Sequence, residues 1–254
     1  MRKRVDPGPR PGRPTLPDGD DGSYTRPTVT AAPALPANGS DGSATADVID
    51  AAAVRAALRR CRRIVERHAT YLTRLDAVLG DGDHGDNLVI GFRAVDAMLD
   101  DLPPDTPLGD VLRAVGHRLV ATVGGASGPL YGTAFLEAGA WIGDTALVGP
   151  ADLAAMLAAA AAGLARRGRC AVGDKTILDS LAPAAECFGA ELATGRPVRD
   201  AYGAAVIAAA RGMRATRPLV ARRGLAMRLG DRAAGHLDPG AVSCLLLLRA
   251  LGGD

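Results

Sequence analysis

Apolar residues recur with the period of a helix from Ala46 to the end of this chain of 254 residues. Leu58, Val65 and Leu72, for example, are seven residues apart and would lie on one helix face. Aromatic residues make up only 3% of the chain while alanine is abundant, and such a composition favours packed helices over sheets. The pattern therefore predicts an all-α fold.

Glycine and proline indicate where the expected helices begin and end. Thr106-Pro107 and Asp238-Pro239 each indicate a capping residue followed by proline at the first helical position, and Gly252-Gly253 indicates the end of the last helix. After a first helix that starts near residue 46, helices are expected near residues 86–100, 108–122, 129–144, 150–167, 175–194, 198–214 and 239–251. We therefore expect a single domain over residues 46–254, a bundle or closed barrel of about eight antiparallel helices.

Residues 1–45 have a different composition. They hold eight of the 17 prolines, many Gly and Asp residues, and almost no large apolar side chains. Such a segment cannot bury enough surface to offset the entropy that ordering would cost. We therefore expect a disordered N-terminal tail over these residues.

The overall composition argues against several classes of partner. A net charge of +2 gives no electrostatic reason to expect a nucleic acid as partner. The chain also contains no charge-free apolar stretch of about 20 residues, so we expect no membrane span. The cysteines are far apart and lack metal-ligand spacing, which favours reduced thiols in a cytoplasmic protein. They are Cys61, Cys170, Cys187 and Cys244. Cys187 and Cys244 fall within apolar helical patterns, so we expect them in the core.

An acidic, glycine-rich segment lies between the first two expected helices, where Asp76, Asp81 and Asp83 occur within eight residues. If their carboxylates converged to about 5 Å, each pair would repel by roughly 3 kcal/mol at an effective dielectric constant of 20. A folded site would therefore need a cation, or the carboxylates would have to point apart. Carboxylate oxygens on short side chains suit Mg²⁺, which also binds substrate phosphates.

Spacing alone leaves two interpretations of this segment open. His84 and Asn87 begin the next expected helix, and a helix N-terminus favours phosphate, which agrees with a metal and phosphate site. The other interpretation is an ordinary Asp/Gly turn in which Asp83 or Asp86 caps that helix.

Three further glycine-rich connections interrupt the helical pattern, at residues 124–132, 173–176 and 235–240. In the first, Ser127 is a candidate cap, and the small residues would let a ligand reach backbone N–H groups. Close helix packing through glycines accounts for the same residues equally well. The other two are also compatible with plain helix starts, with Asp174 as a cap and Lys175 as a surface charge.

In their order and in the residues they contain, the four segments together resemble the nucleotide-binding L subunit of dihydroxyacetone kinases. The resemblance extends over about residues 46–254. The matching stretches are Leu75-Asp-Ala-Val-Leu-Gly-Asp-Gly-Asp-His-Gly-Asp-Asn87, Gly124-Gly-Ala-Ser-Gly-Pro-Leu-Tyr-Gly-Thr133, Gly173-Asp-Lys-Thr-Ile-Leu-Asp-Ser-Leu-Ala-Pro183 and Leu229-Gly-Asp-Arg-Ala-Ala-Gly-His-Leu-Asp-Pro-Gly-Ala241.

The resemblance implies a barrel of eight antiparallel helices that holds ADP or ATP at one end. It implies that Asp76, Asp81 and Asp83 bind two Mg²⁺ ions, which bridge the phosphates. The residues that it assigns to the nucleotide site are His84, Gly85, Asp86, Asn87, Ala126, Ser127, Gly173, Ala182, Asp238, Pro239 and Gly240.

The resemblance also implies a function, that of a phosphotransferase subunit. In that family the ketose is held on a histidine of a separate K-type subunit, and this chain is too short for both halves, so we expect such a partner. The expected substrate is dihydroxyacetone or a related short keto-sugar. The donor is either ATP or a phosphocarrier (M-type) protein of the phosphotransferase system, and a homodimer or hetero-oligomer is expected. The alternative is a nucleotide-loaded regulatory or scaffold protein without turnover.

Two positions depart from the family's pattern. Leu225 stands where an arginine is usual, which removes one expected nucleotide contact, and Arg223 and Arg228 are the candidate substitutes. Asp86 stands where a small or neutral residue is common, and its charge would lie beside the phosphates.

Overall fold

The computed structural model describes residues 49–145 and 147–253. The tail that the sequence predicts to be disordered, residues 1–45, lies outside these described residues. Within them, helices account for the architecture, and the β pairing is limited to an isolated antiparallel bridge between Ile49 and Val148. The prediction of an all-α fold is confirmed.

The helices of the described residues follow one another along the chain with short connections. They are α1 (Ala51–Leu79), α2 (His84–Asp101), α3 (Leu108–Thr122), α4 (Ser127–Ile142), α5 (Pro150–Gly168), α6 (Leu178–Ala193), α7 (Val198–Ala215), the 3-10 helix η1 (Leu225–Ala233) and α8 (Pro239–Gly252).

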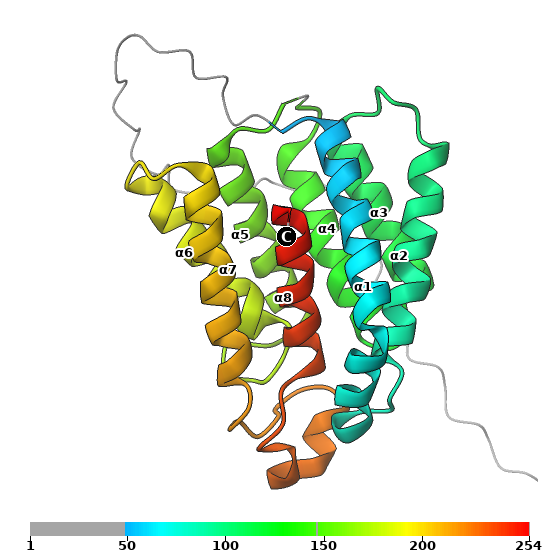
Figure 1. Ribbon diagram of the computed structural model, residues 1–254, viewed down its shortest axis with the longest axis vertical. Helices are drawn as coiled ribbons and strands as arrows, with labels where there is room; N and C mark the ends of the chain where they lie inside the picture. Colours follow the sequence, from blue (N-terminus) through cyan, green and yellow to red (C-terminus); the bar gives the residue numbers. More distant parts are fainter. Residues whose placement is uncertain (1–48, 146, 254) are drawn as a thin grey trace, which may run out of the picture. The chain divides into compact units, whose positions relative to one another are not determined.

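The eight α-helices close into a ring. Each helix packs against the next one in the chain, and α8 returns to pack against α1 (Figure 1). Successive helices run in opposite directions, so the N-termini of α2, α4, α6 and α8 meet at one end of the barrel, which is the lower end in Figure 1. The C-terminal end of α1 and the short helix η1 lie at this same end. The expected closed barrel of antiparallel helices is therefore present.

Amphipathic stripes build the core of the barrel. On α1, Leu58, Val65 and Leu72 are fully buried at the seven-residue spacing seen in the sequence. On α7 the buried stripe consists of alanines four residues apart, Ala201, Ala205 and Ala209. These small side chains let α7 approach α6 closely, which explains why so few aromatic residues are needed.

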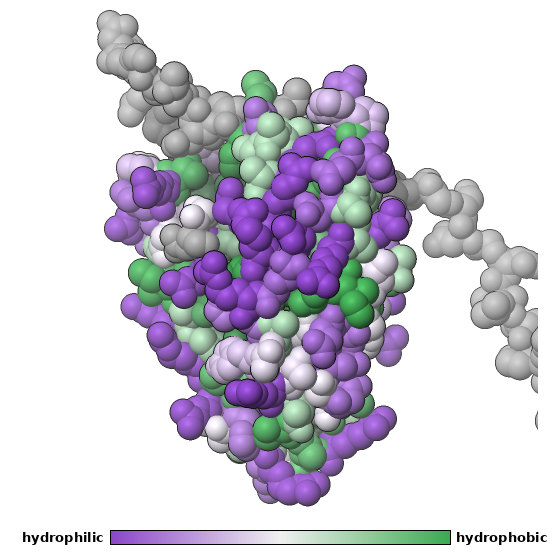
Figure 2. Space-filling model, turned by 45° about the vertical axis from the view of Figure 1, so that its right-hand side comes forward, coloured by the Kyte–Doolittle hydropathy of each residue, from purple (hydrophilic) through white to green (hydrophobic). Residues whose placement is uncertain are grey.

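Polar residues cover the outside of the helices. Figure 2 shows a face on which hydrophilic residues predominate and hydrophobic ones form small scattered patches. Exposed ion pairs such as Arg59 with Asp100 at 2.6 Å and Arg93 with Glu66 at 2.7 Å link neighbouring helices α1 and α2. Among the residues that the structure describes, no helix is long and apolar enough to cross a membrane.

The helix boundaries confirm some sequence signals and correct others. Asp238 caps α8 by accepting a hydrogen bond from the N–H of Ala241 at 2.7 Å, and Gly253 ends it with a φ of 102°. Thr106 does not cap α3, because its hydroxyl donates to the carbonyl of Pro103 at 2.7 Å. Cys244 is buried as expected, whereas Cys187 is only half-buried on α6.

The 3-10 helix η1 was not foreseen from the sequence. It begins after Gly224, which has a φ of 65°, and it is bent at Gly230, which has a φ of 56°. Both glycines adopt left-handed backbone conformations that other residues disfavour. A short helix with three residues per turn leaves no long periodic pattern, and its place in the fold depends on contacts with the end of α1.

Gly212 on α7 supports a test of how closely α6 and α7 pack. A Cβ at this position would overlap the carbonyl oxygen of Asp179 on α6, whereas a Cβ at Gly203, on the same helix, would meet nothing within 4 Å. We expect Gly212→Ala to lower the free energy of unfolding by about 1–3 kcal/mol through overpacking. We expect Gly203→Ala to raise it by up to about 1 kcal/mol through helix propensity.

Denaturant melts followed by circular dichroism would measure both changes. Equal effects of the two substitutions would contradict the close contact between α6 and α7.

Candidate functional site

A cavity of about 400 Å³ opens at the end of the barrel where the four helix N-termini meet. Its walls come from the ends of α1 and α5, the starts of α2, α4 and α8, the loop before α6, and η1. A more open hollow over α4 and α5 carries one carboxylate, that of Glu137, which is already paired with Arg166 at 2.7 Å. Of these two cavities, the first is the one that holds a cluster of carboxylates.

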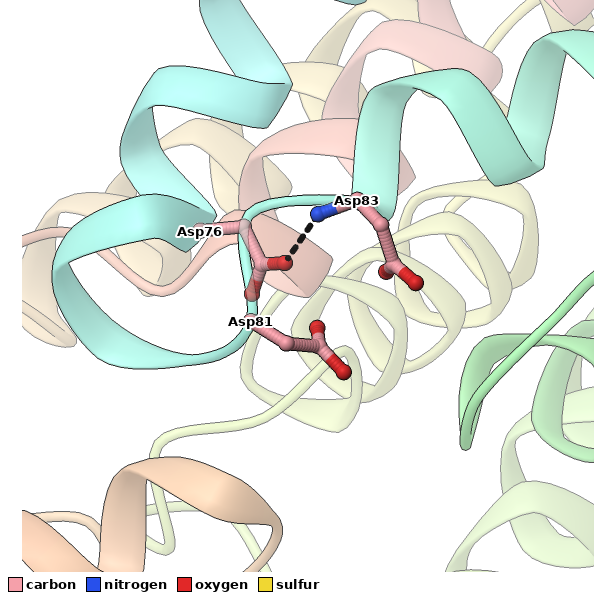
Figure 3. Close-up of side chains that lie close together, drawn as sticks. All are labelled: Asp76, Asp81 and Asp83. Carbon is pink, nitrogen blue, oxygen red and sulfur yellow. Dashed lines mark hydrogen bonds between the residues drawn. The ribbon is translucent and has the colours of Figure 1, made fainter.

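Three carboxylates converge on one wall of this cavity. Asp76 comes from the last turn of α1, and Asp81 and Asp83 come from the connection to α2. One oxygen from each lies within 4.8 Å of the others, and Figure 3 shows the three side chains around one small space. Asp76 is buried, whereas Asp81 and Asp83 are exposed to the cavity side.

Asp76 also organises the connection that carries the other two aspartates. Its Oδ2 accepts hydrogen bonds from the N–H groups of Gly82 at 3.0 Å, Asp83 at 3.1 Å and His84 at 3.3 Å. The bond to Asp83 is the dashed line in Figure 3. A Cβ at Gly80 would overlap the other oxygen of Asp76, and Gly82 has a φ of +76°, so both glycines are required by this geometry.

The arrangement argues against the cap interpretation of the acidic segment, while the metal site stays a prediction. Asp83 precedes α2, but its side chain makes no capping hydrogen bond, and Asp86 lies exposed in the first turn of that helix. Burial raises the pKa of Asp83, a hydrogen bond from Asn87 opposes the rise, and the charges of Asp81 and Asp76 add to it. These three converging carboxylates form no ion pair with a basic side chain of the described residues, and such a cluster fits a hard cation such as Mg²⁺, which binds oxygen ligands.

His84, at the start of α2, connects the cavity wall to the core. Its Nδ1 lies 3.0 Å from the hydroxyl of Ser127, and its Nε2 lies 2.8 Å from the hydroxyl of Ser243. Burial lowers the pKa of His84, so the neutral ring is favoured. Ser127 does not cap α4, because the cap position is Ala126 and the serine hydroxyl is directed to His84 instead.

Lys175, which the sequence suggested as a surface charge, is buried with 1% of its surface exposed. Its ammonium group donates to the carbonyls of Thr216 at 2.8 Å and His236 at 2.5 Å, so it joins the two ends of the segment that carries η1. Burial lowers the pKa of this lysine. Burial also raises the pKa of nearby Asp238 to about 7. Lysine is usually exposed, but here two buried carbonyl groups need hydrogen-bond donors, and the Lys175 ammonium group supplies them.

The loop before α6 is organised by Asp179. Its carboxylate accepts from the N–H of Gly173 at 2.6 Å and from that of Thr176 at 2.7 Å. Asp174 is not the cap of α6 as the sequence suggested, because the helix begins at Leu178 and the Asp174 carboxylate accepts from the N–H of Ala171.

Most of the residues that the sequence assigned to the site line the cavity. These are Asp76, Asp81, Asp83, His84, Asn87, Ala126, Ser127, Asp238, Pro239 and Gly240.

The other assigned residues are not part of the lining found among the described residues. Gly85 packs against the backbone of α1 near Ala69, and Asp86 points to the exposed side. Gly173 donates its N–H to Asp179, and Ala182 packs against the main core. Their roles as nucleotide contacts stay a prediction.

The structure also adds residues to the wall that the sequence did not assign. Arg167 at the end of α5 and Arg223 before η1 both line the cavity, together with Leu225. Of the two arginines considered as substitutes at position 225, Arg223 is therefore at the cavity, and Arg228 is not in its lining. No local pattern could have indicated Arg167, because α5 and η1 are far apart in the sequence, whereas Arg223 was already a candidate from its place beside Leu225.

Comparisons with known proteins agree with this architecture. Residues 78–253 match the DAK2 domain family. The chain is 40% identical over 205 residues to the ADP-binding subunit DhaL of PEP-dependent dihydroxyacetone kinase 2 from Listeria innocua, a match that covers 80% of this chain and 94% of the relative. It is 36% identical over 196 residues to the corresponding DhaL subunit from Escherichia coli, covering 76% of this chain and 92% of that one.

A solved structure is also similar. The crystal structure of the dihydroxyacetone kinase from C. freundii in complex with AMP-PNP and Mg²⁺ aligns with a TM-score of 0.60 and 25% identity. The alignment covers 87% of this chain but 37% of that longer kinase. Taken with the matched domain and the two subunit relatives, it shows that the chain belongs to the DAK2 domain family, as a relative of the DhaL subunits of dihydroxyacetone kinases.

Proposed function

We propose that this chain binds Mg-ADP or Mg-ATP in the cavity and passes a phosphoryl group to a short keto-sugar held on a separate K-type subunit. The observation that carries the proposal is the convergence of Asp76, Asp81 and Asp83 beside four helix N-termini. The names of the relatives, which are ADP-binding subunits of dihydroxyacetone kinases, support it.

The carboxylates would supply the metal-binding part of the site. Asp76, Asp81 and Asp83 would hold two Mg²⁺ ions, which when bound neutralise charge on the phosphate oxygens. Without a cation these carboxylates would repel a polyphosphate, so nucleotide binding should depend on the metal.

Helix N-termini and basic side chains would supply the remaining attraction for the anion. The starts of α2, α4 and α8 line the cavity, and each helix adds about half a positive charge from its dipole. Arg167 and Arg223 add two guanidinium groups to the wall. Loss of the arginine usual at position 225 is thus partly offset by Arg223.

Reconstitution would test the transfer step. A mixture of this chain, a K-type subunit, dihydroxyacetone and Mg²⁺ should form a sugar phosphate when either ATP, or ADP together with a phosphorylated phosphocarrier protein, is added, as followed by ³¹P NMR. The words "PEP-dependent" in the relatives' names favour the phosphocarrier as donor. Tight nucleotide binding with no sugar phosphate from either donor would favour the regulatory or scaffold role instead.

Substitution of Asp81 tests the metal site directly. We expect Asp81→Asn to weaken ADP binding at millimolar Mg²⁺ roughly tenfold or more, because one anionic ligand is lost from a cluster of three. The matched control is Asp101→Asn, which removes an exposed carboxylate at the other end of α2. Isothermal titration calorimetry with and without Mg²⁺ would measure the effect, and equal affinities for both variants would contradict the site.

A substitution at Leu225 tests whether positive charge on the cavity wall attracts the nucleotide. This side chain lines the cavity and is 41% exposed, so an arginine fits there without a cost in the core. We expect Leu225→Arg to tighten ADP binding about fivefold, which corresponds to about 1 kcal/mol for one added cation. Met227→Arg places the same charge two residues along η1 but outside the lining, and it should change the affinity less than twofold. Similar gains for both would point to a general charge effect.

A further inference from the structure

Four side chains form a continuous hydrogen-bond chain from the cavity wall into the core. The hydroxyl of Ser127 lies 3.0 Å from Nδ1 of His84, and Nε2 of His84 lies 2.8 Å from the hydroxyl of Ser243. Ser243 is in turn 2.6 Å from the hydroxyl of Tyr131. Ser127 and His84 line the cavity, whereas Ser243 and Tyr131 lie behind it with 0% and 5% of their surfaces exposed.

The hydrogen-bond chain joins three different helices of the barrel. His84 starts α2, Ser127 and Tyr131 stand one turn apart on α4, and Ser243 is on α8. Its central member is anchored to the backbone, since the hydroxyl of Ser243 lies 3.0 Å from the carbonyl oxygen of Gly240. Every link is a neutral donor and acceptor within hydrogen-bond distance, so the chain holds its members in fixed relative positions.

Hydrogen counting shows that the chain has two possible directions. In the inward direction, Ser127 donates to Nδ1 of His84, Nε2–H donates to Ser243, and Ser243 donates to the carbonyl of Gly240. The hydroxyl hydrogen of Ser127 is then used within the protein, and the cavity sees only its lone pairs.

In the outward direction, Tyr131 donates to Ser243, Ser243 donates to Nε2, and Nδ1–H donates to Ser127. The hydrogen of Ser127 is then free to point into the cavity. An anionic oxygen beside Ser127 needs a donor and is repelled by lone pairs, so its arrival favours this direction. The neutral imidazole changes tautomer without gaining or losing a proton.

We propose that Ser243 and Tyr131 are positioning residues for nucleotide binding, which turn the hydrogen-bond chain outward so that the Ser127 hydroxyl donates to a phosphate oxygen of the nucleotide. The proposal rests on the proposed function, because it needs an anion at Ser127. It assigns a role to two buried residues that lie behind the cavity lining. It also explains why a buried polar row crosses the core at this end of the barrel.

Two variants test the hydrogen-bond chain through the affinity for ADP. Ser243→Ala removes the central link and should raise the Kd for ADP at millimolar Mg²⁺ three- to tenfold, and Tyr131→Phe should raise it by a smaller factor. Two matched controls should stay within twofold of the wild type. Ser180→Ala deletes a buried hydroxyl that donates to the α8 carbonyl of Ala241. Tyr202→Phe deletes only the phenol hydroxyl, which donates to the α8 carbonyl of Leu248.

A spectroscopic readout separates positioning from loss of structure. The chain has four histidines, so ¹⁵N-histidine NMR can follow the ring of His84 once its signals are assigned with a His84→Gln variant. On addition of Mg-ADP, the ring hydrogen of the wild-type His84 should move to Nδ1, and this change should be lost in Ser243→Ala. Thermal melts would show that the variant is folded.

The outcomes distinguish this proposal from the proposed function. A wild-type protein that binds no ADP would contradict both. Normal wild-type binding, combined with unchanged affinity of a folded Ser243→Ala or with the hydrogen remaining on Nε2 in the complex, would overturn the hydrogen-bond chain alone.

Discussion

Closure of the helical ring is the constraint on which the site depends. Each helix packs against its neighbour in the opposite direction, and α8 can close on α1 because the number of helices in the ring is even. This geometry brings the N-termini of the even-numbered helices to one end, where their dipoles favour an anion. The cavity and its glycine-rich loops are at that end for this reason.

The acidic connection adds the opposite charge at the same place. Asp76 accepts three backbone N–H groups with one oxygen, and its carboxylate also converges with those of Asp81 and Asp83. The residue that contributes one carboxylate to the cluster therefore also folds the loop that carries the other two. Gly80 and Gly82 serve this loop by making room for the carboxylate and by adopting a left-handed backbone.

Much of the fold was predictable from local patterns. The period of apolar residues located the eight α-helices, and Asp238 with Pro239 marked the start of α8 as observed. The aspartates of the acidic segment were found for a similar reason, since residues close in sequence needed little tertiary structure to come together. Signals for single residues were less reliable: Thr106 and Ser127 are good caps by type, yet both direct their hydroxyls elsewhere.

The sequence by itself determined the all-α class, the helix order, the acidic cluster and the family, because these depend on local period and on contiguous motifs. Only the tertiary structure decided that Lys175 is buried, that Arg223 lines the cavity, and that His84 links Ser127 to Ser243. Those contacts join segments up to 159 residues apart. Their formation depends on ring closure, which satisfies buried donors and acceptors across helices and leaves no pattern in any one stretch of sequence.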